Sequence, residues 1–165
     1  MGNVAAKYDA RIAAGRQAVE PLIRAGVGYK GAIAVLAFYY CRKQIALHYG
    51  SMTDAAAAAG MTWHCMRDRI DARAASGPAS LPGGTIEAWA AQLAADGLNY
   101  REATFIFKRT LLLTAIAIYG GNRVEAARRL KVHRNTTIPS RIPVAPAYDH
   151  NDSRRGRTPV PQETA

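Results

Sequence analysis

The chain contains the same stretch of sequence twice, at an offset of 71 residues. Residues Leu22–Asp71 align with Leu93–Ile142 without a gap. A duplication constrains the architecture more than composition does, because it predicts two copies of one structural unit. Nine of the fifty aligned pairs are identical: Leu22/Leu93, Gly26/Gly97, Tyr29/Tyr100, Ala32/Ala103, Ile45/Ile116, Ala46/Ala117, Gly50/Gly121, Ala55/Ala126 and Ala56/Ala127.

The repeat divides the 165 residues into two small units. We expect a first unit at 1–74, a Pro- and Gly-rich linker at 75–84, a second unit at 85–142 and a disordered tail at 143–165. A lone unit of about 65 residues buries only roughly 60% of its unfolded surface, so the two units should pack together.

Basic residues are in excess in both units. The net charge is +10, with ten Lys/Arg against five acids in residues 1–76 and nine against four in residues 77–148. Seventeen of the 22 basic residues are Arg, whose guanidinium forms paired hydrogen bonds with phosphate and guanine. This balance indicates nucleic acid as the partner, with an anionic membrane surface as the alternative.

Other functional classes find little support. Two cysteines are too few for a disulfide framework, the first residues lack the apolar core of a signal peptide, and no apolar run is long enough to span a bilayer. Cys41, His48, His64 and Cys65 lack the paired spacing of zinc ligands, and no phosphate loop, paired-carboxylate motif or nucleophile elbow is present. The sequence predicts a cytoplasmic protein that is not an enzyme and has no cofactor.

The apolar residues follow a helical period throughout, which predicts an all-α fold. Two long helices, Tyr29–His48 and Tyr100–Tyr119, are apolar on most sides and should pack against each other, notably through Val35, Leu36, Phe38, Phe105, Ile106 and Phe107. The other expected helices are Asn3–Ala25, Thr53–Ala59, Trp63–Ala74, Thr85–Ala95, Arg123–Leu130 and one beginning near Arg134.

Each unit closes with two short helices. The first of these begins with a side-chain acceptor followed three residues later by an acid, an arrangement that satisfies free amides at a helix start. These pairs are Ser51 with Asp54 and Asn122 with Glu125. Two alanines follow in each unit and would let the next helix cross at close range. The pattern predicts a helix-turn-helix in both units.

The turn between the two short helices differs in the two units. Gly60 suits the left-handed conformation that such a turn needs, whereas Lys131 stands at the corresponding position of the second unit. Keeping that conformation with Lys should cost about 1 kcal/mol. Thr62 and His133 follow as expected caps of the second helix, and Met61 and Val132 should fill the small core behind the turn.

The second unit resembles the Fis family, the factor for inversion stimulation, and the similar C-terminal domain of NtrC-type activators. The residues that carry the resemblance are Leu111-Leu112, Ala115, Gly120-Gly121-Asn122, Glu125-Ala126-Ala127-Arg128, Leu130, Val132 and Arg134-Asn135-Thr136. They span about 30 residues, and the first unit matches the pattern more loosely.

The resemblance implies contacts to bases and phosphates of duplex DNA from the start of the second short helix and from basic residues one to two turns later. The implied DNA-binding residues are His133, Arg134, Asn135 and Thr136 in the second unit, and Thr62, Trp63, His64, Cys65, Arg67 and Arg69 in the first; Arg128, which belongs to the matched pattern on the preceding helix, is a further candidate. Two departures from the family pattern stand out. Trp63 replaces the family arginine, and Pro139 should end the last helix near Thr137.

The tail contains a further candidate for DNA contact. Arg155-Gly156-Arg157 is similar to the core of an AT-hook, in which an extended Arg-Gly-Arg lies in the narrow minor groove of A·T tracts. Its Thr158 stands where an AT-hook has proline. A flexible tail without a binding role is the alternative.

These observations predict a nucleoid-associated, DNA-binding protein, either a transcriptional regulator or an architectural factor of host or phage. The two units would form a built-in pseudo-dimer and reach successive major grooves about 34 Å apart. One alternative is a phage DNA-packaging or recombination accessory factor. Another is a helical protein–protein adaptor that has lost DNA binding, and self-association is a further possibility.

Overall fold

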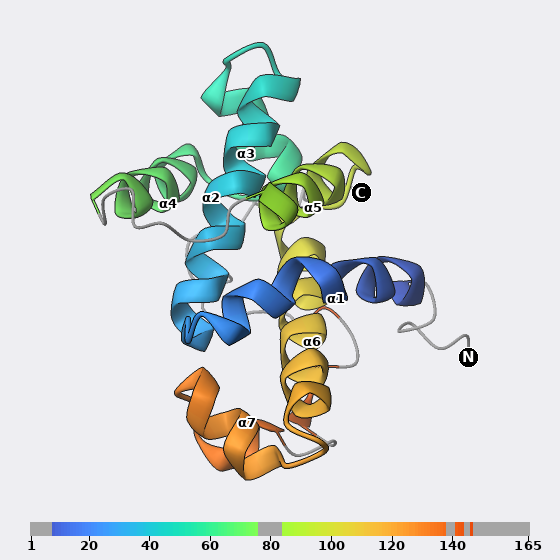
Figure 1. Cartoon of the computed structure of the whole chain (residues 1–165). Coiled ribbons are helices and arrows are strands. Elements are labelled where there is room, and N and C mark those ends of the chain that lie inside the picture. The colour runs from blue at the N-terminus through green and yellow to red at the C-terminus, as the bar shows by residue number, and fades with distance from the viewer. Residues whose placement is uncertain (1–7, 76–83, 138–140, 144–145, 147–165) are drawn as a thin grey trace, which may run out of the picture.

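The computed structural model describes residues 8–75, 84–137, 141–143 and 146, and within these ranges every regular element is a helix. Figure 1 shows α2 and α6 along the length of the molecule, with α3 at one end and α7 at the other. The predicted all-α fold is confirmed. The elements are α1 (Asp9–Arg24), α2 (Tyr29–Leu47), α3 (Met52–Ala59), α4 (Trp63–Ala75), α5 (Gly84–Ala95), α6 (Tyr100–Ile118), α7 (Arg123–Leu130) and the 3-10 turn η2 (Arg134–Thr137).

The two halves of the chain have the same pattern of helices and turns. Shifting α2 and α3 by 71 residues reproduces the bounds of α6 and α7, and the ends of α1 and α5 correspond in the same way. The left-handed residues also correspond: Gly26 with Gly97, Tyr49 with Gly120, Gly50 with Gly121, and Gly60 with Lys131. The halves differ at the end, because α4 has thirteen residues and η2 only four.

Most helix bounds agree with the sequence prediction to within one or two residues. The expected start of the first helix at Asn3 lies outside the described residues, as do most of the linker and most of the tail. The first residues of the predicted tail take part in the fold, because the Pro143 carbonyl accepts a hydrogen bond from Arg109 Nη1 at 2.9 Å. No helix in the described ranges is long and apolar enough to cross a membrane.

The first helix of each half packs on the long helix of the other half. α1 lies mainly against α6, and α5 lies mainly against α2 (Figure 1). The long helices α2 and α6 also contact each other, as do α1 and α5. These four helices enclose one core with buried residues from both halves. Apolar periodicity predicted that the halves would pack together, whereas the exchange of first helices is a finding of the structure.

Contacts between the halves are also reciprocal at the turns. A Cβ added at Gly28 would lie 3.2 Å from Lys131 Cδ, and one added at Gly60 would lie 3.8 Å from Asn99 Cβ. Asn99 and Lys131 are the residues that correspond to Gly28 and Gly60 at the offset of 71. When residue i contacts j and the counterpart of j contacts the counterpart of i, the arrangement is that of a twofold axis.

Side-chain caps explain where several helices begin. Ser51 and Asn122 accept hydrogen bonds from the backbone amides of Asp54 and Glu125, as the sequence predicted. A complete capping box forms at the start of α6, where Asn99 accepts from the Glu102 amide and the Glu102 carboxylate accepts from the Asn99 amide. This box has the sequence signature Asn-x-x-Glu, so it could have been found from the sequence.

One buried hydrogen bond joins the halves at a position where they differ. The Tyr40 hydroxyl, on α2, donates to the Leu98 carbonyl at 2.6 Å and accepts from Gln44 Nε2 at 3.1 Å. Burial raises the pKa of Tyr40. The residue that corresponds to Tyr40 on α6 is Leu111, which has no polar group for such a bond.

Candidate nucleic-acid interface

The second unit contains the short helix α7, a turn with a left-handed residue and the 3-10 turn η2, which takes the place of the second helix that the sequence predicted from near Arg134. α7 ends at Leu130, and Lys131 has a left-handed backbone (φ 55°), the conformation that its counterpart Gly60 also has. The His133 ring nitrogen Nδ1 accepts from the Asn135 amide at 3.2 Å and caps the turn η2. Thr137, the last residue of η2, is fully buried, and its hydroxyl lies 3.0 Å from the Arg123 carbonyl. The α7–η2 pair is therefore held by its own turn and by one buried threonine.

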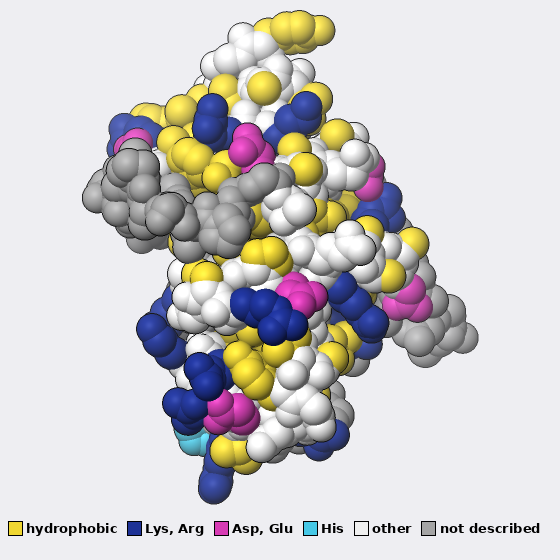
Figure 2. Space-filling model, viewed as in Figure 1, with side chains coloured by type: hydrophobic (Ala, Val, Ile, Leu, Met, Phe, Trp, Pro, Cys, Tyr) yellow, Lys and Arg dark blue, Asp and Glu magenta, His cyan; other side chains and the backbone are white. Residues whose placement is uncertain are grey.

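The outer surface of this unit is strongly basic. Residues 120–137 contain five Lys/Arg and a single acid. All five cationic side chains are exposed: Arg123, Arg128, Arg129, Lys131 and Arg134. Figure 2 shows Lys and Arg side chains, with a His among them, gathered over the end of the molecule where Figure 1 places α7. Of the second-unit residues predicted to bind DNA, His133, Arg134 and Arg128 are exposed, and Asn135 and Thr136 are half-buried.

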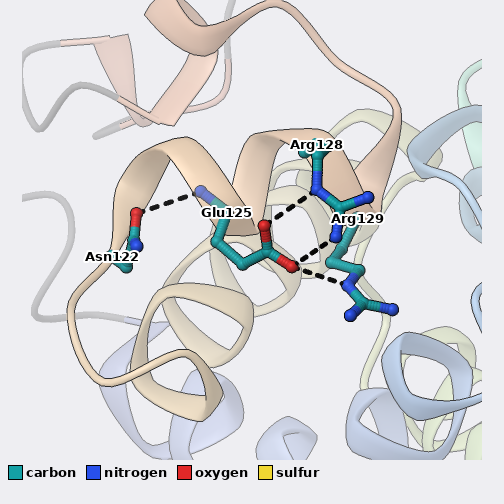
Figure 3. Close-up of polar contacts among 4 residues, drawn as sticks. All are labelled: Asn122, Glu125, Arg128 and Arg129. Carbon is teal, nitrogen blue, oxygen red and sulfur yellow. Dashed lines mark hydrogen bonds and ion pairs between the residues drawn. The ribbon is translucent and has the colours of Figure 1, made fainter.

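Two of these arginines are held by the one acid of the segment. Arg128 Nε and Nη2 donate to the two oxygens of Glu125 at 2.8 and 2.6 Å, and Arg129 Nε donates to Glu125 Oε1 at 2.8 Å (Figure 3). Hydrogen bonds from Arg128 and then Arg129 lower the pKa of the Glu125 carboxyl to about 2. The carboxylate therefore stays ionised, and it accepts hydrogen bonds from two N–H groups of the Arg128 guanidinium.

The first unit presents a different surface at the corresponding position. Trp63, at the start of α4, is 41% exposed, and its ring stacks on His64 with a centroid distance of 3.7 Å. The Arg67 guanidinium lies 4.9 Å from the Trp63 ring centroid and 4.0 Å from the Asp71 carboxylate. The structure therefore brings Trp63, His64 and Arg67 together as a stacked cluster.

Arg69 is not part of that cluster. Its guanidinium lies 4.5 Å from the ring centroid of Tyr100 on α6, and its Nη1 donates to the Cys65 carbonyl at 3.0 Å. Thr62, His64 and Arg69 line a groove of about 870 Å³ between the α3–α4 turn and the start of α6. Arg69 thus connects the halves of the molecule, whereas the sequence prediction had assigned it to DNA.

The two units carry the same net charge, but the segments in which a helix-turn-helix was predicted differ sharply in charge. Residues 49–66, which correspond to 120–137, contain one acid, Asp54, and no Lys or Arg. The segments therefore carry formal charges of −1 and +4, although each unit as a whole carries +5. Arg123, Arg129 and Lys131 were missing from the predicted site. Counting charge over each motif instead of each unit would have found them.

Some expected features lie outside the described residues or have no counterpart within them. Arg155, Gly156 and Arg157 fall in the part of the chain that the structure does not describe. Within the described ranges, no group of three or more His, Cys, Asp or Glu side chains could hold a metal ion. No protein-family model matches the chain, and no match was found among curated proteins or solved structures.

Proposed function

We propose that the protein binds duplex DNA through α7 and η2 and acts as a transcriptional regulator or as an architectural factor of the nucleoid or of a phage. The observation that carries the proposal is the cluster of five exposed cationic side chains on α7, its left-handed turn and η2, with a single acid among them. Duplex DNA carries one negative charge per roughly 1.7 Å of helix axis, and neutralising phosphates dominates affinity. A short basic element with Arg134 exposed at its head suits both phosphate contact and guanine contact.

The reciprocal packing supports a pseudo-dimeric arrangement of the two motifs. Twofold-related motifs can meet successive major grooves about 34 Å apart, as paired helix-turn-helix proteins do. In this arrangement α7–η2 supplies most of the electrostatic attraction, because its counterpart in residues 49–66 contains no Lys or Arg. A role as a DNA-packaging or recombination accessory factor would use the same surface.

The first unit favours a second candidate function, a helical adaptor that contacts another protein. Leu47, Tyr49 and Trp63 are exposed apolar side chains on or next to a segment with a net charge of −1. Tyr49 is fully exposed and has a left-handed backbone. Aromatic residues of this kind are enriched at protein interfaces, and on α7 the exposed large apolar side chain is the single Val124.

Salt-dependent binding to a duplex of about 24 base pairs tests the proposed function. Replacing Arg128, Arg129 and Arg134 with Ala should lower the slope of log affinity against log salt by about 2–3, since each phosphate contact contributes roughly 0.9. Fluorescence anisotropy between about 50 and 200 mM salt measures the slope.

A matched control removes the same charge elsewhere. Arg16, Arg24 and Lys30 are exposed residues of α1 and α2, and replacing these three with Ala should change the slope by less than about one. Equal losses in the two triple variants would show that net charge alone attracts DNA. A flat salt plot for the wild-type protein would remove the DNA-binding function and leave the adaptor.

A further inference from the structure

Glu125 occupies the surface that the proposed function assigns to phosphate. Its two carboxylate oxygens accept three hydrogen bonds from Arg128 and Arg129, at 2.6–2.8 Å, in the geometry that a phosphodiester oxygen would take (Figure 3). The side chains of Arg128 and Arg129 are 64% and 52% exposed, so solvent and ligands can reach them. The backbone amide of Glu125 is bound to Asn122, which fixes the start of the helix beneath the carboxylate.

We infer that the Glu125 carboxylate competes with DNA phosphate for Arg128. In the free protein the carboxylate accepts hydrogen bonds from two N–H groups of Arg128, and on duplex binding a phosphate takes the place of the carboxylate. This inference rests on the proposed function. Exposed ion pairs between Arg and a carboxylate contribute little to stability, so the exchange costs little. Glu125 therefore lowers affinity for DNA without blocking it.

The first unit has an acid at the position of Glu125 but lacks the two arginines, so the proposed competition is confined to the second unit. Asp54 corresponds to Glu125 and has the same capping position on α3. The residues that correspond to Arg128 and Arg129 are Ala57 and Ala58. The backbone amide of this acid donates to the helix cap, Ser51 or Asn122, in both units, whereas only in the second unit does its carboxylate meet arginines three and four residues later.

The test compares Glu125→Gln with Glu20→Gln. Glu20 pairs with Arg24 on α1 at 2.7 Å, so the control variant removes the same charge and the same kind of exposed pair. Glu125→Gln should bind the duplex about two- to tenfold more tightly than wild type, and Glu20→Gln should change affinity by less than about twofold. In the wild-type protein, hydrogen bonds from Arg128 and Arg129 hold the pKa of the Glu125 carboxyl low, and this pKa, followed by NMR, should rise when duplex is added because the arginines leave the carboxylate.

The outcomes separate the inference from the proposed function. Duplex binding with equal affinities for the two variants, or with the pKa of Glu125 unchanged on binding, overturns the exchange and leaves the function in place. Weaker binding by Glu125→Gln also overturns it, since the carboxylate would then position the arginines for DNA. Absence of duplex binding by wild type and Glu125→Gln alike overturns the proposed function and the inference with it.

Discussion

The two corresponding segments, residues 49–66 and 120–137, share a first short helix and its turns, and they differ in almost all of their exposed chemistry. Both have the same helix bounds, the same cap position and the same left-handed turn residue. One exposes Ala57 and Ala58 where the other exposes Arg128 and Arg129. A few buried or capping positions are thus enough to keep the fold, which leaves the outer face free to change function.

The positions that keep the fold can be named. The alanine pairs Ala55-Ala56 and Ala126-Ala127 are buried to the same degree in both segments. Met66 and Thr137 correspond and are both fully buried, although one is apolar and the other is hydrogen-bonded to the Arg123 carbonyl. Burial at this site is therefore kept while polarity is not, because a buried hydroxyl with a partner costs little.

The largest expected effect is on stability, and it concerns Gly15 in the first helix, a position at which the two halves have different residues. A Cβ added at Gly15 on α1 would lie 2.1 Å from Cζ2 of the buried Trp89 on α5. Ile86 stands at the corresponding position of α5. Gly15→Ala should lower the free energy of unfolding by about 1–3 kcal/mol, measured by urea denaturation. Gly31→Ala is the control, because its Cβ would meet only Val27 at 3.4 Å and should stabilise the helix.

A graft tests whether the two segments face one duplex. Replacing Ala57 and Ala58 with Arg copies the arginine pair of α7 onto α3, where both positions are exposed. If the pseudo-twofold arrangement places α3 at the same duplex, affinity should rise about tenfold and the salt slope by about two. Arginines at Ala13 and Ala14 on α1 provide the control for charge. An unchanged slope in the graft would mean that only the second unit touches DNA.

The smallest effect concerns the turn residues. Gly60→Ala should cost about 1 kcal/mol, because Ala must adopt the left-handed backbone that Gly60 has. Lys131→Gly removes the strain of the left-handed backbone, but it also raises the conformational entropy of the unfolded chain. Because the two effects oppose each other, the free energy of unfolding should change by only about 0.5 kcal/mol. Thermal unfolding of both variants measures the difference. An unchanged melting temperature for Gly60→Ala would show that the left-handed backbone at this position does not disfavour a side chain.

Much of the local structure was predictable, and the candidate site was predictable only in part. The bounds of α6 and α7 and the caps at Ser51 and Asn122 follow from short-range signals. The assignment of Arg69 to the binding surface did not anticipate its contact with Tyr100 on the other half. A helical period places Arg69 on a face, and it says nothing about which distant aromatic ring covers that face.

The sequence by itself determined the all-α fold, the corresponding pattern of helices and turns, and the excess of positive charge, since caps, turns and periodicity act over a few residues. Tertiary structure alone decided that α1 crosses to α6 and α5 to α2, and that Arg69 lies against the ring of Tyr100. The physical reason is range. An apolar stripe is buried equally well by several partners, and a basic side chain on a helix face can meet several distant groups, so only the packed molecule selects among them.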